Sequence, residues 1–304
     1  MDLNALKFFC DVVETESLTR AAERSQVSQS AISQRIRRLE DLYGQVLLER
    51  GKGKGRATVT EAGRQLYVGA KQILLDAGAL DTHMMGLNSG PSGTVSVATV
   101  YSVGLHLLPT RLKPFLSANP RIKVHVEYSQ TGKVYQDLLS SNVDVGIVAC
   151  PVDRPGLEIL PFVDETMAVI CPLGHPLARK TQIGISDLAG QAFVAFSGDI
   201  PTRTLIDSQF KLRGVKPNVV SEYDNIETIK NLVEIGIGVS IVPQYTAAKE
   251  ARDGAFALVS LRKEDAFIRP VGIMVRRNRT RGAEVSAFLD AMTNRSSDQI
   301  AVQD

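Results

Sequence analysis

The segment SQSAISQRIRRLEDLYG, residues 28–44, is the feature that most constrains how this chain folds. Its apolar side chains recur at the spacing of one helix face and are Ile32, Ile36, Leu39 and Tyr43. Such spacing predicts an amphipathic helix whose apolar stripe is buried. The opposite face carries short polar and basic side chains, namely Ser30, Gln34 and Arg37, with Ser33 and Arg38 on its flanks. A solvated surface helix would show the same pattern, so the preceding residues have to decide what this helix does.

Two shorter helices are predicted in front of this segment. The first has apolar residues at helical spacing, which are Leu3, Leu6, Cys10 and Val13. Ser17 is placed to cap a second helix that begins LTRAAER, and Ser28 is placed to cap the third. Ala21 and Ala22 provide small side chains where the helices approach each other. Three helices in this order predict a helix-turn-helix DNA-binding domain.

The third helix of such a domain enters the major groove with its N-terminus first. Short side chains at Ser30 and Ser33 allow this approach, and the amide of Gln34 suits adenine. The expected phosphate contacts come from the arginines of this helix, which are Arg35, Arg37 and Arg38. Base contacts at the tip and phosphate contacts a turn later explain why small polar residues precede the arginines.

Gly44 is suited to cap the C-terminus of this helix, and a hairpin wing is predicted after it. Strand-like residues 46–50 and 57–60 flank the sequence GKGKGR. The basic side chains of this loop, which can contact phosphates or a minor groove, are Lys52, Lys54 and Arg56. A flexible basic loop is the alternative. Across residues 28–64 eight basic residues outnumber four acidic ones, while the whole chain has a net charge of only +2, so the basic site is local.

Residues 1–60 are thus a predicted winged helix-turn-helix domain, and a long helix over residues 61–88 is expected next, with Thr60 as its cap. Its apolar residues alternate at spacings of three and four and are Leu66, Ala70, Ile73, Ala77, Leu80, Met84 and Leu87. This heptad pattern favours a partner helix along roughly 40 Å, and hence a homodimer. A helix packed within its own chain is the alternative. Residues 89–93, within NSGPSG, are expected to form a hinge.

From residue 94 to 304 short apolar runs alternate with helical segments, which predicts an α/β domain. The strand-like runs are TVSVAT, IKVHVEYS, VDVGIVAC, TMAVICP, AFVAFS, PNVVSEYD, GVSIVP and VGIMVRR. Residues 164–265 are predicted to form a second half, inserted between residues 94–163 and 266–295 of the first. Because the chain crosses twice between the halves, we expect a cleft that closes around a ligand.

The ligand is expected where strands end against helix N-termini. The segments at these positions are residues 101–102, 129–131, 197–203 and 225–227. The candidate residues within them are Tyr101, Ser102, Thr131, Ser197, Thr202 and Arg203. Hydroxyls from several helix starts, together with one arginine, predict a small polar or anionic effector. An ordinary N-cap role for each hydroxyl is the alternative.

The sequence contains no recognisable catalytic or metal-binding pattern. The four histidines are scattered, and the spacings typical of hydrolases, metalloproteases, dinucleotide-binding loops and P-loops are absent. Cys10, Cys150 and Cys171 lack CxxC spacing and are expected to be core thiols. We therefore expect no enzyme activity, no metal and no cofactor. Without a signal peptide or an apolar membrane segment, the chain is expected to be cytoplasmic and free of membrane contact.

Several longer motifs span nearly the whole chain. They are SLTRAAERSQVSQSAISQRIRRLEDLYG, LLER and VTEAG around the wing, LSANPRIKVHV, VDVGIV, LGHPLA and LVEIGIGVSIVP. In these motifs the chain resembles the LysR-type transcriptional regulators. The resemblance implies a winged helix-turn-helix, a dimerising linker helix and an effector domain similar to the periplasmic-binding-protein fold. It also implies homotetramers, built as dimers of dimers, that bend promoter DNA.

The resemblance also implies roles for individual residues. The residues that would contact bases are Gln29, Ser30, Ser33 and Gln34. Arg50 and the wing lysines would contact the DNA backbone or the minor groove. Effector contacts fall to Ser102, Thr131 and Thr202. This chain departs from the family in its glycine-rich, basic wing. It also has Ala149 and Cys150 where some carboxylate-binding relatives carry an arginine, so an anionic effector would depend on Arg203 or Arg154.

Together these patterns predict a sequence-specific transcriptional regulator whose binding to promoter DNA responds to a small-molecule effector. RNA polymerase is a further candidate partner. Two alternatives share parts of the pattern. A solute-binding receptor would have the cleft, but it would also have an export signal and no recognition helix. A metabolic enzyme with a basic N-terminal appendage would turn over its ligand.

Overall fold

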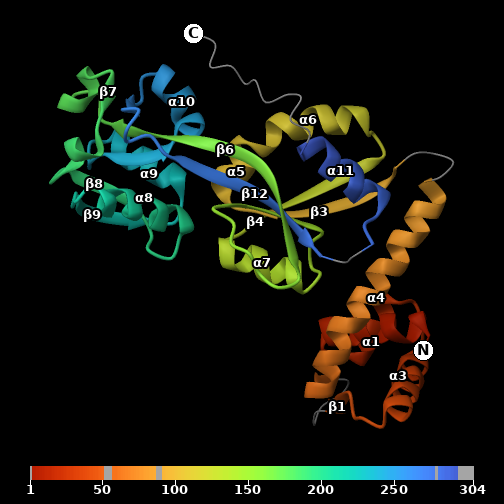
Figure 1. Ribbon diagram of the computed structural model, residues 1–304. Helices are drawn as coiled ribbons and strands as arrows, with labels where there is room; N and C mark the ends of the chain where they lie inside the picture. The colour runs from red at the N-terminus through yellow and green to blue at the C-terminus, as the bar shows by residue number, and fades with distance from the viewer. Residues whose placement is uncertain (1, 51–56, 87–90, 278–279, 294–304) are drawn as a thin grey trace. The chain divides into compact units, whose positions relative to one another are not determined.

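The computed structural model describes residues 2–50, 57–86, 91–277 and 280–293 (Figure 1). Its contacts divide the chain into an N-terminal unit of residues 1–91 with 279–283, and a C-terminal unit of residues 92–278 with 284–304. Each unit has its own hydrophobic core.

The N-terminal unit contains three short helices, a hairpin and a long helix. These elements are α1 (Leu3–Thr15), α2 (Leu18–Arg24), α3 (Gln29–Tyr43), β1 (Leu48–Arg50), β2 (Ala57–Val59) and α4 (Glu61–Gly86). The expected caps are confirmed. Ser17 Oγ accepts a hydrogen bond from the amide of Arg20. Ser28 Oγ accepts one from the amide of Ala31. Gly44 follows α3 with a φ of 61°, a left-handed conformation that glycine adopts without strain.

The first three helices enclose the core of this unit. The predicted stripe on α3 is confirmed at Ile32, Ile36 and Leu39, which are at most 4% exposed and pack with Leu6 and other buried residues of α1. The prediction is wrong at Tyr43, which is 43% exposed. The reason is its place at the end of α3, where the chain turns at Gly44 and no other described helix packs over the apolar stripe.

The long helix α4 has two different halves. Thr60 caps it by accepting a hydrogen bond from the amide of Gly63 at 3.0 Å, as expected. Near its N-terminus, Ala70 is fully buried against the helix-turn-helix core, so this part of the heptad pattern packs within its own chain. Further along, Leu80 and Met84 are each 57% exposed, as an unpaired apolar stripe requires. Leu87 lies outside the described residues.

The C-terminal unit is built on an eight-stranded mixed sheet in the order β4-β3-β5-β12-β6-β11-β7, with β10 also paired to β6. A separate parallel pair is formed by β8 and β9. The strands are β3 (Gly93–Thr99), β4 (Ile122–Tyr128), β5 (Val145–Ala149), β6 (Leu157–Cys171), β7 (Gln182–Ile183), β8 (Ala192–Phe196), β9 (Asn218–Tyr223), β10 (Ser240–Pro243), β11 (Ala257–Leu261) and β12 (Ile268–Arg276). The helices are α5 (Tyr101–His106), α6 (Leu108–Ala118), α7 (Thr131–Leu139), α8 (Pro201–Leu212), α9 (Ile226–Glu234), α10 (Gln244–Arg252) and α11 (Ala283–Thr293), with 3₁₀ turns η1 (Pro176–Arg179) and η2 (Ile185–Leu188).

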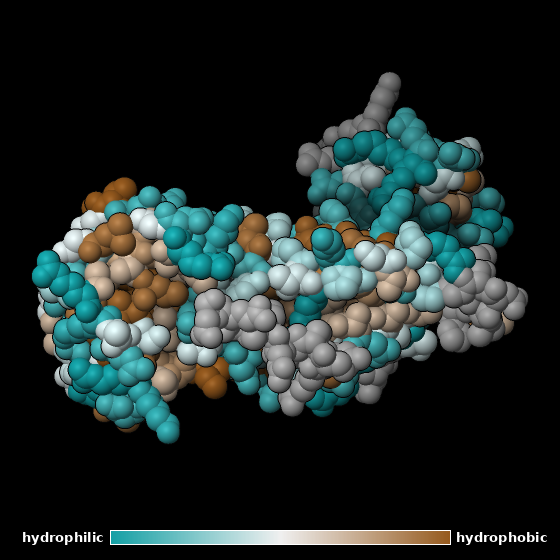
Figure 2. Space-filling model, turned by 90° about the horizontal axis from the view of Figure 1, so that it is seen from above, coloured by the Kyte–Doolittle hydropathy of each residue, from teal (hydrophilic) through white to brown (hydrophobic). Residues whose placement is uncertain are grey.

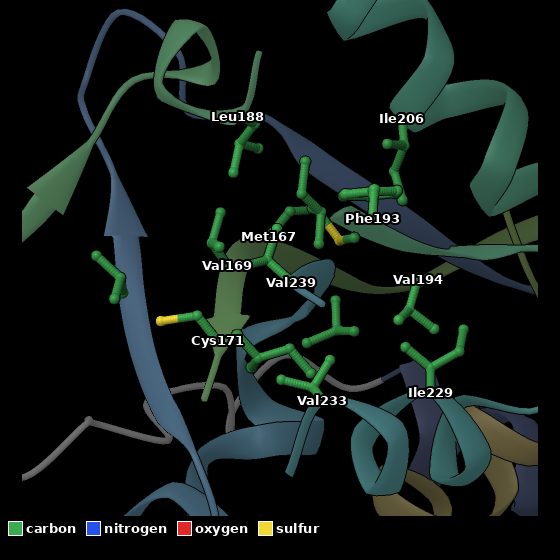
Figure 3. Close-up of a cluster of buried hydrophobic side chains, with 14 of the residues drawn as sticks. Met167, Val169, Cys171, Leu188, Phe193, Val194, Ile206, Ile229, Val233 and Val239 are labelled. Carbon is green, nitrogen blue, oxygen red and sulfur yellow. The ribbon is translucent and has the colours of Figure 1, made fainter. Parts of the chain in front are cut away.

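Two lobes share this sheet, and the antiparallel strands β6 and β12 run through both (Figure 1). Lobe I comprises β3, β4, β5, α5, α6, α7 and α11 with the adjoining parts of β6 and β12, and lobe II comprises the elements from the second part of β6 to β11. In lobe II, residues of β6 such as Met167 and Val169 pack against Phe193 of β8, Ile206 of α8 and Val233 of α9 (Figure 3). Lobe I has separate clusters that include Ile273 of β12 and Phe288 of α11. The expected α/β architecture with two halves is confirmed.

One strand differs from its expected length. Only TMAVICP was predicted to be extended, whereas β6 begins at Leu157 and covers fifteen residues. Pro161 breaks the apolar pattern, and it lies where the register between β6 and β12 shifts near Val271 and Gly272. A bulge accommodates proline because it needs no ladder hydrogen bond at that point. The crossing between the lobes is therefore a continuous paired ribbon with one irregularity.

Gly238, in the sequence GIGVS, has a structural role. A Cβ atom at this position would collide with the carbonyl group of Ala192. The close approach lets the amide of Val239 donate to that carbonyl at 2.8 Å and joins β10 to the β8–β9 pair. The glycine is thus needed for strand contact in lobe II.

The three cysteines are free thiols. The expected core position is confirmed for Cys10 and Cys171, which belong to hydrophobic clusters, but it is wrong for Cys150, which is only half-buried. Cys10 and Cys171 are buried, and burial raises their pKa to about 12 and about 11, respectively. Burial also raises the pKa of the half-buried Cys150. Among the helices in the described ranges, none has the length and apolarity needed to cross a bilayer.

Exposed apolar residues are visible as brown areas among teal ones at the end of the C-terminal unit that lobe II forms (Figure 2). The most exposed of them in lobe II are Leu173, Leu212 and Ile235, at 60%, 76% and 70%. They belong to different parts of the lobe, since Leu212 is the last residue of α8 whereas Leu173 follows β6 and Ile235 follows α9. Apolar exposure alone therefore does not mark a site on this lobe.

Candidate DNA-recognition helix and effector cavity

The N-terminal part of α3 presents a polar surface. Gln29, Ser30 and Gln34 are exposed and Ser33 is half-buried, in line with the groove-facing positions expected for them. Ser28 Oγ lies 2.9 Å from Ser30 Oγ while it caps the helix, so these two hydroxyls belong to one hydrogen-bonded N-terminus. Arginines 37 and 38 are exposed one turn later. Polar side chains that can bond to base edges therefore lie in the first turns of α3, and the cationic side chains follow them along the helix. Recognition helices have this arrangement.

Arg35, one of the arginines expected to contact phosphates, makes contacts within the N-terminal unit. Its guanidinium pairs with the carboxylate of Asp2 and lies 5.5 Å from the ring centroid of Phe8. An arginine engaged by a carboxylate and an aromatic face packs one helix on another. The side chain of Arg35 thus joins α3 to α1.

The wing is anchored to α3 by a carboxylate. Glu40 Oε1 accepts hydrogen bonds from the amides of Leu47, at 2.9 Å, and Leu48, at 3.3 Å, just where β1 begins. β1 and β2 pair antiparallel with Leu48 opposite Val59, which agrees with the expected hairpin. Lys52 and Lys54 lie outside the described residues, and so does the side chain of Arg50.

An ion cluster joins the helix-turn-helix to α4. Glu14 of α1 pairs with Arg24 of α2 at 2.7 Å and with Lys71 of α4 at 3.1 Å. Burial by itself would raise the pKa of Glu14, but the hydrogen bonds and charges of these two cations lower it below the usual value. The cluster ties α4 to the recognition domain within this unit.

The C-terminal unit contains a cavity of about 300 Å³ lined by residues of both lobes. Four of the residues expected to bind an effector line it, and they are Tyr101, Ser102, Thr131 and Thr202. Lobe I contributes the starts of α5 and α7, and lobe II contributes the start of α8 and the loop before α9. Polar groups at helix N-termini thus meet at one place, as the strand-end argument predicts.

Arg269 is the cation of this cavity, and it was not among the candidates. It lies at the start of β12, lines the cavity and is only 1% exposed. Its Nε donates to Glu165 Oε2 at 2.8 Å, and Nη2 donates to the same oxygen. Nη1 donates to Thr202 Oγ1 at 3.2 Å, and both terminal nitrogens donate to Ser102 Oγ, at 3.3 and 3.4 Å. One side chain therefore joins β6, α5 of lobe I and α8 of lobe II.

Ser197 and Arg203 are not among the residues that line the cavity. The guanidinium of Arg203 instead pairs with Asp207 and Glu222 at 2.8 Å and donates to the carbonyl of Phe196. Arg154, the other cation considered for an anionic effector, lies 4.3 Å from the ring centroid of Tyr135 and also lies away from the lining. The expectation that either arginine supplies the positive charge of the cleft is corrected by these contacts.

Three further polar residues line the cavity. Gln130 and Asp199 lie within the strand-end segments 129–131 and 197–203, although neither was singled out as a candidate, and Asp224 lies one residue before the segment 225–227. A signal was available for Arg269, since it is a lone charge beside the apolar run of VGIMV at the predicted crossing between halves. A buried charge at such a crossing requires a partner, and the partner is Glu165.

A second polar contact joins the lobes beside the cavity. Nε2 of His106, the last residue of α5, lies 2.8 Å from Glu227 Oε1 at the start of α9. The other oxygen of Glu227 lies 3.0 Å from Nζ of Lys230, which is 2% exposed and also pairs with Glu250. The lobes are thus connected by polar groups on which their relative position depends.

Comparisons with known protein families show which family the chain belongs to. Residues 3–64 match the model of bacterial regulatory helix-turn-helix proteins of the lysR family, and residues 88–297 match the LysR substrate binding domain. The chain belongs to the LysR family of transcriptional regulators. It is accordingly a DNA-binding transcriptional regulator with an effector-binding domain.

Individual LysR-family relatives agree with this assignment. The chain is 30% identical over 249 residues to the Hca operon transcriptional activator HcaR of Escherichia coli, covering 81% of this chain and 82% of that protein. It is 28% identical over 250 residues to the transcriptional regulator CysL of Bacillus subtilis, covering 82% and 83%.

Solved structures of LysR-family regulators share the fold. A full-length OxyR variant from Pseudomonas aeruginosa matches with a TM-score of 0.75 and 23% identity, covering 97% of this chain and 98% of that one. Full-length CbnR in complex with its target DNA matches with a TM-score of 0.66 and 25% identity, covering 96% and 99%. The effector binding domain of QuiR in complex with shikimate matches with a TM-score of 0.61 and 22% identity, covering 66% and 96%.

Proposed function

We propose that this LysR-family regulator reads promoter DNA with α3 and that a small polar metabolite in the cavity between the lobes modulates this binding. The observation that carries the proposal is the position of Arg269 at the cavity wall. Its hydrogen bonds reach Ser102 of lobe I and Thr202 of lobe II at once, so a ligand that displaces or strengthens either contact changes how the lobes meet. A coupling free energy of roughly 1 to 3 kcal/mol between ligand and DNA would be enough for regulation.

In the proposed DNA complex, Gln29, Ser30, Ser33 and Gln34 contact bases. The phosphate contacts come from Arg35, Arg37 and Arg38. The wing residues Arg50, Lys52 and Lys54 add contacts to the backbone or minor groove. The solved DNA complex of CbnR supports this use of a LysR-family helix-turn-helix. The exposure of the polar N-terminal part of α3 supports it for this chain.

The proposed domain organisation assigns residues 1–60 to DNA binding, 61–88 to a dimerising helix, 89–93 to a hinge and 94–304 to effector binding. Residues 89 and 90 of the hinge lie outside the described residues, and its last residue, Gly93, already belongs to β3. Exposed apolar residues on the second half of α4, such as Leu80 and Met84, support pairing of two copies there. A homodimer would place two α3 helices in successive major grooves, and a dimer of dimers would extend the contact. Sedimentation of the purified chain tests this assembly, because a monomer at micromolar concentration would refute it.

The test of the function is an anisotropy titration of the full-length protein against labelled DNA from upstream of its own coding sequence. The titration is repeated at several salt concentrations and with a panel of small metabolites. We expect a preference for one fragment over bulk competitor DNA, a linear dependence of log affinity on log salt, and a change in affinity with one metabolite class.

Two results would contradict the proposal. Equal affinity for every DNA fragment would favour the solute-binding receptor, in which the cavity serves ligand capture alone. Turnover of the bound metabolite by the purified chain would favour the enzyme with a basic appendage. The membership of the chain in a family of regulators weighs against both alternatives.

A further inference from the structure

The charge of the cavity differs from what a lone lining arginine suggests. A guanidinium has five N–H groups, and in Arg269 five hydrogen bonds go to Glu165, Ser102 and Thr202. The carboxylate of Glu165 neutralises its charge at hydrogen-bonding distance. Arg269 therefore has neither a spare donor nor a spare charge for the carboxylate of a ligand.

Two carboxylates of lobe II remain exposed at the lining. Asp199 lies before α8, Asp224 lies before α9, and both line the cavity. Within the described part of the chain, neither carboxylate has a hydrogen bond or an ion pair. Helix capping does not occupy them, because α9 is capped by Asn225 and the N-cap position of α8 is Ile200. Lobe II thus presents net negative charge to the cavity, which favours a cationic group of a ligand.

Apart from Arg269, the wall from lobe I has no charged side chain among the described residues of the lining, so no carboxylate stands beside its helix N-termini as Asp199 stands beside that of α8. Gln130 is the N-cap residue of α7 but makes no side-chain cap bond, and Gln130, Thr131 and Gly132 all line the cavity. The space around Gly132 is open, since nothing lies within 4 Å of the place where a Cβ would stand. The first amides of a helix without a side-chain cap attract an anionic group.

We infer that the cavity binds a small zwitterion, of the size and charge pattern of a free amino acid. Its ammonium group lies toward Asp199 and Asp224 of lobe II, and its carboxylate lies toward the N-terminus of α7 in lobe I. The ligand therefore spans both lobes, and its two charges draw them together. A volume of about 300 Å³ is at the small end for a metabolite pocket, which fits this size. The inference rests on the proposed function in taking this cavity as the effector site.

Titration calorimetry of the full-length protein tests the inference, with the twenty proteinogenic L-amino acids as probes. For each amino acid that binds, the matched amine without the carboxylate and the matched acid without the ammonium group are titrated as well. We expect at least one amino acid to bind, and each counterpart to bind about tenfold more weakly or worse.

Asp199→Asn and Asp224→Asn should each weaken the binding of that amino acid by about tenfold or more and leave the affinity for the deaminated acid unchanged. Asp253→Asn is the matched control, because Asp253 is an exposed acid of lobe II that does not line the cavity. It should leave all affinities unchanged. Unaltered thermal midpoints of the three exposed-site variants verify that they fold.

The inference is overturned if none of the twenty amino acids binds, or if the deaminated acids bind as tightly as the amino acids. It is also overturned if Asp199→Asn and Asp224→Asn behave like the control. The proposed function fails by a separate result, in which a ligand of any charge fills the cavity and leaves the anisotropy titration with DNA unchanged.

Discussion

Replacing Glu165 by glutamine removes the negative charge that accompanies Arg269 where the lobes cross. Both side chains are 2% exposed, so the remaining guanidinium charge would be buried without a counter-ion. Breaking a buried pair in this way costs about 3–5 kcal/mol. We expect the low end, about 3 kcal/mol, because the glutamine oxygen can still accept a hydrogen bond and because Ser102 and Thr202 still accept from Arg269. For a domain of this size, such a loss lowers the thermal midpoint by about 6–12 °C.

The assay is thermal unfolding of the full-length protein followed by circular dichroism, together with a double-mutant cycle. The cycle uses Glu165→Gln, Arg269→Met and the two combined. Removing both charges should cost less than the sum of the single losses, because neither charge is then left alone. Asp207→Asn is the control, since Asp207 is half-exposed and Arg203 keeps Glu222 as a partner. It should lower the midpoint by less than ~2 °C. Additive losses in the cycle would refute the coupling that we assign to the pair.

Three further predictions concern other parts of the chain. Gln34→Ala should cost about 1–3 kcal/mol on the cognate site and much less on random DNA, and equal losses in the anisotropy titration would exclude base reading. Lys52→Ala should weaken binding to all sequences and reduce the salt slope by about 1, whereas an unchanged slope would remove the wing from the interface. Burial by itself would raise the pKa of Glu250, but Lys230 lowers it below its ordinary value of 4.5. Its stabilising contribution is therefore complete above that pH and lost as the pH falls, so in urea unfolding the gap between wild type and Glu250→Gln should be constant from pH 7 to about 5 and close toward pH 3. A gap that widens in acid would contradict this.

The features that could be predicted from the sequence are those determined by near neighbours. A cap such as Ser17 or Ser28 contacts an amide three residues away, and the stripe of α3 follows from the helical period. Both features depend only on residues that are close together in the chain, so the recognition helix and its polar N-terminus could be predicted. Burial was wrongly predicted for Tyr43, because the helical period does not show where neighbouring elements stop packing against a helix.

The cavity was predictable in position and much less so in charge. Arg269 is defined by partners that are 67, 104 and 167 residues away in the chain, namely Thr202, Glu165 and Ser102. These residues come together only when β6 and β12 pair in the folded protein, and no local sequence pattern predicts that contact. Arg203 shows the converse error, because its sequence position beside Thr202 suggested the cleft while Asp207, one helical turn away, engages its charge.

The insertion of lobe II into the sequence of lobe I has a consequence for the order in which the chain acquires structure during synthesis. Lobe II is a continuous stretch and can close its core as soon as Phe267, shortly after β11, has been made. Lobe I cannot, because Ile273 of β12 and Phe288 of α11 belong to its core and are translated after the whole of lobe II. Until then, its first strands expose apolar edges to the cell, and a ribosome that stalls before residue 268 would release a chain prone to aggregation.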